Sequence, residues 1–121
     1  MRLLREDRTI VCERCVLADN PWTRLKGLLG RRGLDDGEGL LIKPTSSIHM
    51  FFMRFPIDAV FLDRDLRVLK VAAELKPWRM AAKKGAKQVL ELGAGEAARR
   101  GVEPGQRLVL AQEEGDEPAE G

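Results

Sequence analysis

Aromatic residues are scarce in this chain of 121 residues. They make up 5% of the sequence, tyrosine is absent, and the single histidine is His49. So few rings cannot supply the series of stacking surfaces on which single-stranded nucleic acids bind. The net charge does not favour nucleic-acid binding either. The chain has 21 Lys and Arg against 19 Asp and Glu, which leaves a formal net charge of only +2. We therefore expect no nucleic-acid partner.

Long apolar runs are also missing. No segment approaches the roughly 20 apolar residues that span a bilayer, and residues 1–8 lack the apolar core and cleavage site of a signal peptide. We expect a cytoplasmic protein without a membrane partner. A composition of 44% hydrophobic and 33% charged residues is typical of a soluble globular chain. We predict one globular domain over residues 1–112 and a flexible acidic tail over residues 113–121.

Cysteine occurs only twice, as Cys12 and Cys15. Two residues in a CxxC pattern can bind a metal or act as a dithiol, but these two fall within a β-branched segment that reads as a strand. Side chains three apart on a strand point to opposite faces, and a zinc site would need two further soft ligands. We interpret both cysteines as half-buried structural residues, and we expect no metal and no cofactor.

Short apolar and β-branched segments separated by turn residues predict most of the secondary structure. About six or seven strands are expected, and two short helices, the first with Asn20 as its N-cap and Pro21 at its first helical position. The predicted strands cover residues 9–18, 40–42, 48–55, 57–62, 66–72, 88–92 and 107–111, and the helices cover residues 20–30 and 96–100. The fold class that follows is α+β, with about six or seven strands in a mostly antiparallel, strongly twisted sheet or partial barrel.

One stretch, residues 46–63, concentrates the polar groups that are hardest to explain. It holds all four phenylalanines, and His49, Arg54 and Asp58 are embedded among them. A buried charge must be paired or used, because leaving it unpaired is too costly. An ion pair between Arg54 and Asp58 across Pro56 is as good an explanation as contact with a ligand. Glu91 is a further acid within an apolar strand, and Ser47 lies two residues before His49.

At these residues the chain resembles a known family. The segment from His49 to Asp63, HMFFMRFPIDAVFLD, is similar to the signature of the domain-of-unknown-function 192 family of bacterial and archaeal proteins. The segments TRLKGLLGR at residues 23–31 and VLELGAG at residues 89–95 match as well, so the resemblance covers about residues 10–110. Met50 departs from the pattern, since threonine often follows the histidine, and so does Gly93. The resemblance implies a compact, β-rich domain and carries no settled activity.

Three hypotheses for function follow. The first is a small ligand-binding or accessory domain in which a pocket around residues 46–58 holds a small polar or anionic ligand. Its candidate binding residues are Ser47, His49, Arg54, Asp58 and Glu91. The second is a hydrolytic or acid-base enzyme that uses His49 with Asp58 or Glu91. The third is an interaction module that uses the basic loop at residues 76–87. The sequence defines neither the oligomeric state nor any catalytic residue.

Overall fold

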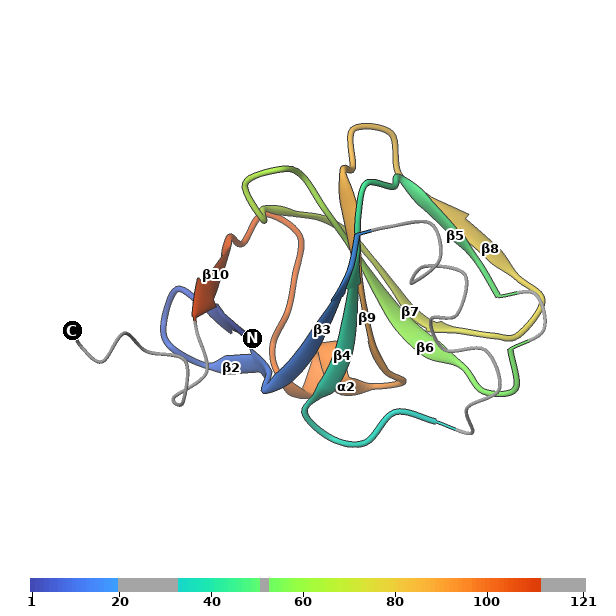
Figure 1. The fold of residues 1–121 in the computed structure, drawn as a ribbon, viewed down its shortest axis with the longest axis horizontal. Helices are drawn as coiled ribbons and strands as arrows, with labels where there is room; N and C mark the ends of the chain where they lie inside the picture. The colour runs from blue at the N-terminus through green and yellow to red at the C-terminus, as the bar shows by residue number, and fades with distance from the viewer. Residues whose placement is uncertain (20–32, 51–52, 112–121) are drawn as a thin grey trace.

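The computed structural model describes residues 1–19, 33–50 and 53–111 (Figure 1). Within these residues the chain forms ten strands and one four-residue helix, α2 (Glu96–Arg99). The strands are β1 (Arg2–Arg5), β2 (Ile10–Cys12), β3 (Arg14–Ala18), β4 (Glu38–Ile42), β5 (Ser47–His49), β6 (Ile57–Leu62), β7 (Val68–Leu75), β8 (Met80–Ala82), β9 (Gln88–Gly93) and β10 (Leu108–Ala111).

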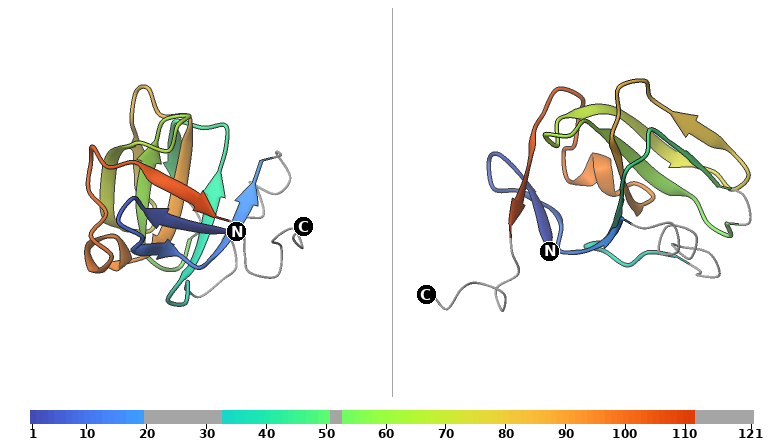
Figure 2. Two further views of the ribbon diagram at one scale, coloured as in Figure 1. Left: turned by 90° about the vertical axis from the view of Figure 1, so that its left-hand side faces the viewer. Right: turned by 45° about the horizontal axis from the view of Figure 1, so that its top comes forward.

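Three sheets are built from these strands. The largest has five strands in the order β3-β4-β9-β6-β7, and all its pairs are antiparallel except β3 with β4. A three-stranded sheet in the order β10-β1-β2 lies at one side of it, as the left view of Figure 2 shows. The two-stranded ribbon of β5 and β8 lies at the opposite side of the molecule (Figure 1).

Strands β6 and β9 occupy the middle of the molecule, and every residue in them is buried. Both strands are largely apolar on both faces, apart from Asp58 in β6 and Gln88 and Glu91 in β9, which is typical of strands covered from two sides. Val60 and Leu90 point into a cluster shared with the three-stranded sheet and α2, whereas Phe61 and Val89 point into a second cluster with Ile48 and Met50. Two cores therefore sandwich the centre of the five-stranded sheet.

The predicted α+β class is wrong, because the described residues are mostly strand and contain one short helix. The predicted helix at residues 96–100 corresponds to α2, while the one predicted at residues 20–30 and the tail at 113–121 lie outside the described residues. The number of strands was underestimated because β1 and β8 are short and, apart from Leu3, their residues are only partly buried or exposed. Neither strand carries the apolar pattern on which the prediction relied.

The strand predicted at residues 9–18 is interrupted at Glu13. The backbone N–H groups of Glu13 and Arg14 both donate to the carbonyl oxygen of Gly37, at 2.8 Å each. This bend passes the chain from the three-stranded sheet to the five-stranded sheet. It also resets the alternation of side chains, so Cys12 and Cys15 both point into the first core cluster. The expectation that they face opposite sides is therefore wrong.

Candidate anion-binding cleft

A cleft of about 330 Å³ is lined by residues at one end of the five-stranded sheet. The segments that carry these residues lie at the upper end of this sheet in the ribbon of Figure 1. The ends of β3 and β4, the start of β9 and the turn between β6 and β7 meet there, as the strand registers require. The lining residues are Asp19, Lys43, Pro44, Arg64, Lys87 and Gln88. The cleft thus gathers short segments that are far apart in the sequence.

Backbone hydrogen bonds hold the walls of the cleft in place. The N–H of Lys43 donates to the carbonyl of Ala18 at 3.1 Å, which ties the end of β4 to the end of β3. The N–H of Lys87 donates to the carbonyl of Leu62 at 2.8 Å. The Gln88 side-chain amide donates to the carbonyl of Asp63 at 2.9 Å and fixes the β6–β7 turn over the start of β9. The basic side chains therefore project from a well-supported scaffold.

The charges that line this cleft are unbalanced. Lys43, Arg64 and Lys87 supply three cations, and Asp19 supplies the one carboxylate. Asp63 lies in the same turn as Arg64, but its Oδ1 accepts the backbone N–H groups of Asp65 at 2.8 Å and Arg67 at 2.9 Å. That carboxylate therefore has local partners within its own turn. The surplus of positive charge favours an anion, and the volume lies at the lower end of the range for small-molecule sites.

The predicted site residue Asp58 lies at the opposite end of the same sheet and is completely buried. Its carboxylate accepts three backbone N–H groups, from Glu74 at 2.8 Å, Gly95 at 3.1 Å and Ala97 at 2.8 Å. These donors belong to β7, to the turn after β9 and to α2. Asp58 therefore joins three elements and satisfies N–H groups at the start of the helix that have no partner within it.

Glu91 is buried as well, but on the other face of the sheet. It lies opposite Ala59 in the β6–β9 ladder, whereas Asp58 lies opposite Leu92, so the two carboxylates point in opposite directions. Burial raises the pKa of the Glu91 carboxyl to about 7. The structure therefore does not bring Asp58 and Glu91 into one site.

The other three predicted residues lie near the two-stranded ribbon. Ser47 and His49 are exposed residues of β5, and His49 is opposite Met80 of β8. Arg54 is exposed in the segment that leads to β6. None of the five predicted residues lines the cleft at Lys43. Ligand binding by them stays a prediction.

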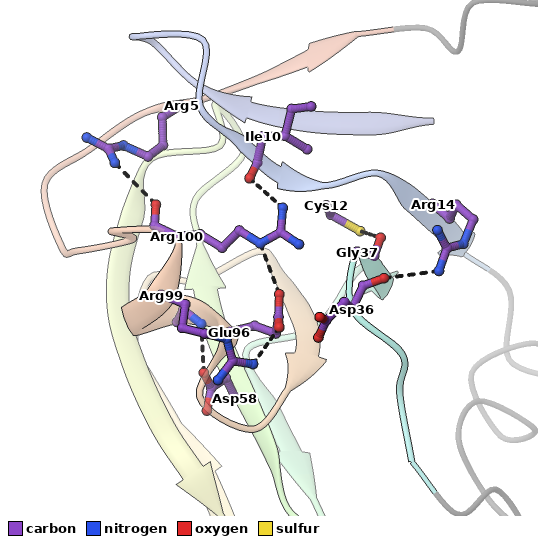
Figure 3. Close-up of polar contacts among 11 residues, drawn as sticks. Arg5, Ile10, Cys12, Arg14, Asp36, Gly37, Asp58, Glu96, Arg99 and Arg100 are labelled. Carbon is purple, nitrogen blue, oxygen red and sulfur yellow. Dashed lines mark hydrogen bonds and ion pairs between the residues drawn. The ribbon is translucent and has the colours of Figure 1, made fainter.

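A buried acid that the sequence did not single out, Glu96, organises the end of the molecule around α2 (Figure 3). Its carboxylate forms ion pairs with Arg99 and with Arg100, whose Nε lies 3.0 Å from Oε1. Burial alone would raise the pKa of Glu96, but hydrogen bonds, the strongest from Arg99, outweigh it and hold that pKa below its usual value. Arg100 also donates to the carbonyl of Ile10 at 2.9 Å, which connects α2 to β2.

The cleft residues escaped prediction because each is an ordinary surface residue in the sequence. Lys43 follows a short strand, Arg64 lies in a hairpin turn, and Lys87 precedes a strand. Only Lys87 belongs to the basic segment that was singled out. The usable signal was the position of these residues, since each stands at the end of a strand that pairs within one sheet.

Comparison with known proteins identifies the family. The model of DUF192, described as "Uncharacterized ACR", matches residues 3–110. The chain belongs to the DUF192 family. The family resemblance noted in the sequence is thereby confirmed, and the β-rich structure agrees with it.

Two solved structures resemble this DUF192 chain closely. A protein of unknown function from Novosphingobium aromaticivorans is 29% identical, with a TM-score of 0.77 over 90% of this chain and 82% of that one. A putative transcription regulator from Sinorhizobium meliloti is 27% identical, also with a TM-score of 0.77, over 89% of each chain. No curated protein matches the chain. Across the described residues, no helix has the length and apolar character needed to cross a membrane.

Proposed function

We propose that this DUF192 protein binds a small anionic ligand in the cleft formed by Lys43, Arg64 and Lys87. The observation that carries the proposal is that three cationic residues line one cleft in which Asp19 is the single acidic lining residue. The planar guanidinium of Arg64 can donate two parallel hydrogen bonds to a carboxylate or phosphate. The two lysines supply compact charges that add to its field. A ligand carrying one such group fits a cleft of about 330 Å³.

Binding of inorganic phosphate and citrate, followed by calorimetry and thermal shift, tests the proposal. Both probes should raise the melting temperature of the wild-type chain in a concentration-dependent way, because a ligand that binds only the folded state stabilises it. Arg64→Gln and Lys87→Gln should each weaken affinity about tenfold, or about 1.4 kcal/mol, through loss of a charge-assisted hydrogen bond. Neither substitution should lower the stability of the unliganded protein.

Lys84→Gln is the matched control, because it removes one exposed positive charge from outside the cleft. It should leave the affinity for both probes within about twofold of wild type, since exposed charges at a distance are screened by salt. Equal weakening by Lys84→Gln would show that the probes respond to overall charge only. Absence of any binding to the wild-type chain would count against the proposal outright.

A second candidate function is an interaction module built on the β5–β8 ribbon. The segment before and within β8 exposes two large apolar side chains, Trp78 at 58% and Met80 at 66%, beside the cations Lys76 and Arg79. The Sinorhizobium relative is described as a putative transcription regulator, and a two-stranded ribbon with cations can enter the major groove of DNA. Duplex DNA is therefore the partner to test for this candidate, although the overall charge and the few aromatic residues led us to expect no nucleic-acid partner.

Reciprocal variants separate the two functions. If the ribbon binds DNA, the affinity should fall steeply between about 50 and 200 mM salt, and Arg79→Gln should weaken it while Arg64→Gln should not. The opposite pattern, or affinity below non-specific levels, would remove this candidate. Acid-base or hydrolytic activity of His49 with Asp58 or Glu91 stays a prediction, as does a cytoplasmic location.

A further inference from the structure

The two cysteines form a pair inside the protein. Cys12 is completely buried and Cys15 is 5% exposed, and both belong to the core cluster between the five-stranded and three-stranded sheets. Both are thiols. The bend at Glu13 brings them to the same side, although they belong to strands of different sheets.

Gly39 defines where the two thiols meet. Cys15 lies directly opposite Gly39 in the parallel β3–β4 ladder. The sulfur of Cys12 occupies the space above the same glycine, because a Cβ atom added there would lie 2.7 Å from the Cys12 Sγ. Because Gly39 has no side chain, there is room above it for the Cys12 sulfur, next to Cys15, which pairs with Gly39.

The chemical environment distinguishes the two sulfurs. The Cys12 thiol donates to the carbonyl oxygen of Gly37 at 3.6 Å (Figure 3). A hydrogen bond with Cys15 lowers the pKa of Cys12 and outweighs the effect of its burial. The same interaction, together with burial, raises the pKa of Cys15. Of the two thiols, Cys12 is therefore the one that loses its proton more readily.

We propose that Cys12 and Cys15 are a redox site that closes reversibly into an intramolecular disulfide in exchange with a small disulfide such as oxidised glutathione. In the first step the Cys12 thiolate attacks one sulfur of the oxidant, whose S–S bond breaks and releases one thiolate. In the second step the Cys15 thiolate attacks Cys12 and releases the other. The protein loses two protons and two electrons, and the oxidant gains both as two thiols.

The position of the pair at two sheet edges gives the oxidant a route to it. β2 is the edge strand of the three-stranded sheet and β3 is the edge strand of the five-stranded sheet. Glu13 and Arg14, which connect them, are exposed. Opening this segment breaks the pairing of β2 with β1 and of β3 with β4. It also breaks the hydrogen bonds that Cys15 exchanges with Met1, from the Cys15 N–H at 3.0 Å and to the Cys15 carbonyl at 3.3 Å. The rest of both sheets can stay paired, so this opening needs less than global unfolding.

Oxidation of the intact, folded chain with oxidised glutathione tests the site. After quenching, denaturation and alkylation, mass spectrometry should show that the wild-type chain passes from two modifiable thiols to none without a glutathione adduct. The product should be monomeric, and dithiothreitol should restore both thiols. Circular dichroism of the oxidised protein should keep the native β-sheet spectrum.

Cys15→Ser is the variant that isolates the second step. It keeps Cys12 but removes the resolving thiol, so the proposal requires a stable adduct of one glutathione on Cys12. If the variant fails to fold, the wild-type measurement still decides the matter. Retention of two free thiols in the folded wild-type chain under conditions that oxidise the urea-unfolded chain would overturn the proposal, as would products that are only intermolecular.

Discussion

Asp58 and Glu91 are buried acidic residues on neighbouring strands, and they differ in their hydrogen bonding and therefore in their effect on stability. Asp58 accepts three backbone N–H groups, and such bonds compensate a carboxylate for the water it loses. Among the described residues no hydrogen bond or ion pair reaches the Glu91 side chain, and its pKa is raised to about 7 by burial. The carboxylate of Asp58 holds three elements together through these hydrogen bonds, whereas burial makes the Glu91 carboxyl harder to ionise.

Replacing Asp58 should therefore be costly. Asp58→Ala leaves three N–H donors without their acceptor in the interior, and each unsatisfied buried group costs about 1–3 kcal/mol. We expect the free energy of unfolding to fall by at least about 3 kcal/mol, measured by urea denaturation with circular dichroism. Asp65→Asn, at an exposed position of the β6–β7 turn, should change it by less than about 0.5 kcal/mol. Comparable losses in both variants would contradict this role.

Glu91 should make stability depend on pH between about 4.5 and 7. The pKa of Glu91 in the folded protein, about 7, is higher than the ordinary glutamate value of 4.5. Below pH 4.5 the carboxyl is protonated in both the folded and the unfolded protein, so Glu91 does not lower the stability there. As pH rises from 4.5 the unfolded chain ionises first, so stability falls and then levels off above pH 7, about 3 kcal/mol lower.

The measurement is a series of urea titrations from pH 4.5 to 8 on wild type and Glu91→Gln. The substitution should flatten the decline and make the protein more stable than wild type at pH 8. Glu103→Gln, at an exposed position, should keep the wild-type slope. A Glu91→Gln curve parallel to wild type would show that some other group produces the dependence.

At the scale of elements, sequence patterns were sufficient where a strand is buried on both faces. The apolar run at residues 57–62 coincides with β6, and the one at 88–92 falls within β9. Short strands such as β8 were missed because they form by pairing with a strand that is distant in sequence, here β5, and three residues are too few to show a strand pattern of their own. The break at Glu13 was missed because it depends on the carbonyl of Gly37, a residue distant in sequence.

The candidate cleft was unpredictable for the same reason. Lys43, Arg64 and Lys87 become neighbours only through the pairing of β9 with both β4 and β6. By contrast, the stretch of residues 46–63 was singled out because His49, Arg54 and Asp58 are embedded in an apolar run. In the structure Asp58 is buried, and its hydrogen-bond partners are backbone N–H groups. A polar residue within an apolar run therefore has the same sequence pattern whether it supports the fold or binds a ligand.

The contact between β2 and β4 offers a test at this scale. Gly39→Ala places a methyl group 2.7 Å from the Cys12 sulfur and should destabilise the protein by about 1–3 kcal/mol through overpacking. Adding Cys12→Ala should recover part of that loss, because it removes the sulfur that the new methyl group meets. A double-mutant cycle by urea denaturation measures the coupling. Additive effects would mean that Gly39 is needed only for its close contacts with β9.

At the scale of the molecule, one core cluster connects two of the sheets. It receives Leu3 and Leu108 from the three-stranded sheet and Val60 and Leu90 from the five-stranded sheet. Arg100 reinforces the connection through its bond to the carbonyl of Ile10. Neither sheet can separate without exposing the same apolar surface to water, which favours unfolding as one cooperative unit.

Leu108→Ala tests this cooperativity. Leu108 on β10 is 1% exposed, so the substitution should cost about 2–4 kcal/mol, whereas Leu110→Ala on the same strand, at 54% exposed, should cost less than about 0.5 kcal/mol. If the sheets unfold together, hydrogen exchange of Leu108→Ala should show equal losses of protection for the slowest amides of β1 and of β9. Loss confined to β1, β2 and β10 would instead make the three-stranded sheet an independently opening unit, through which the thiols of Cys12 and Cys15 would become accessible without disturbing the anion cleft.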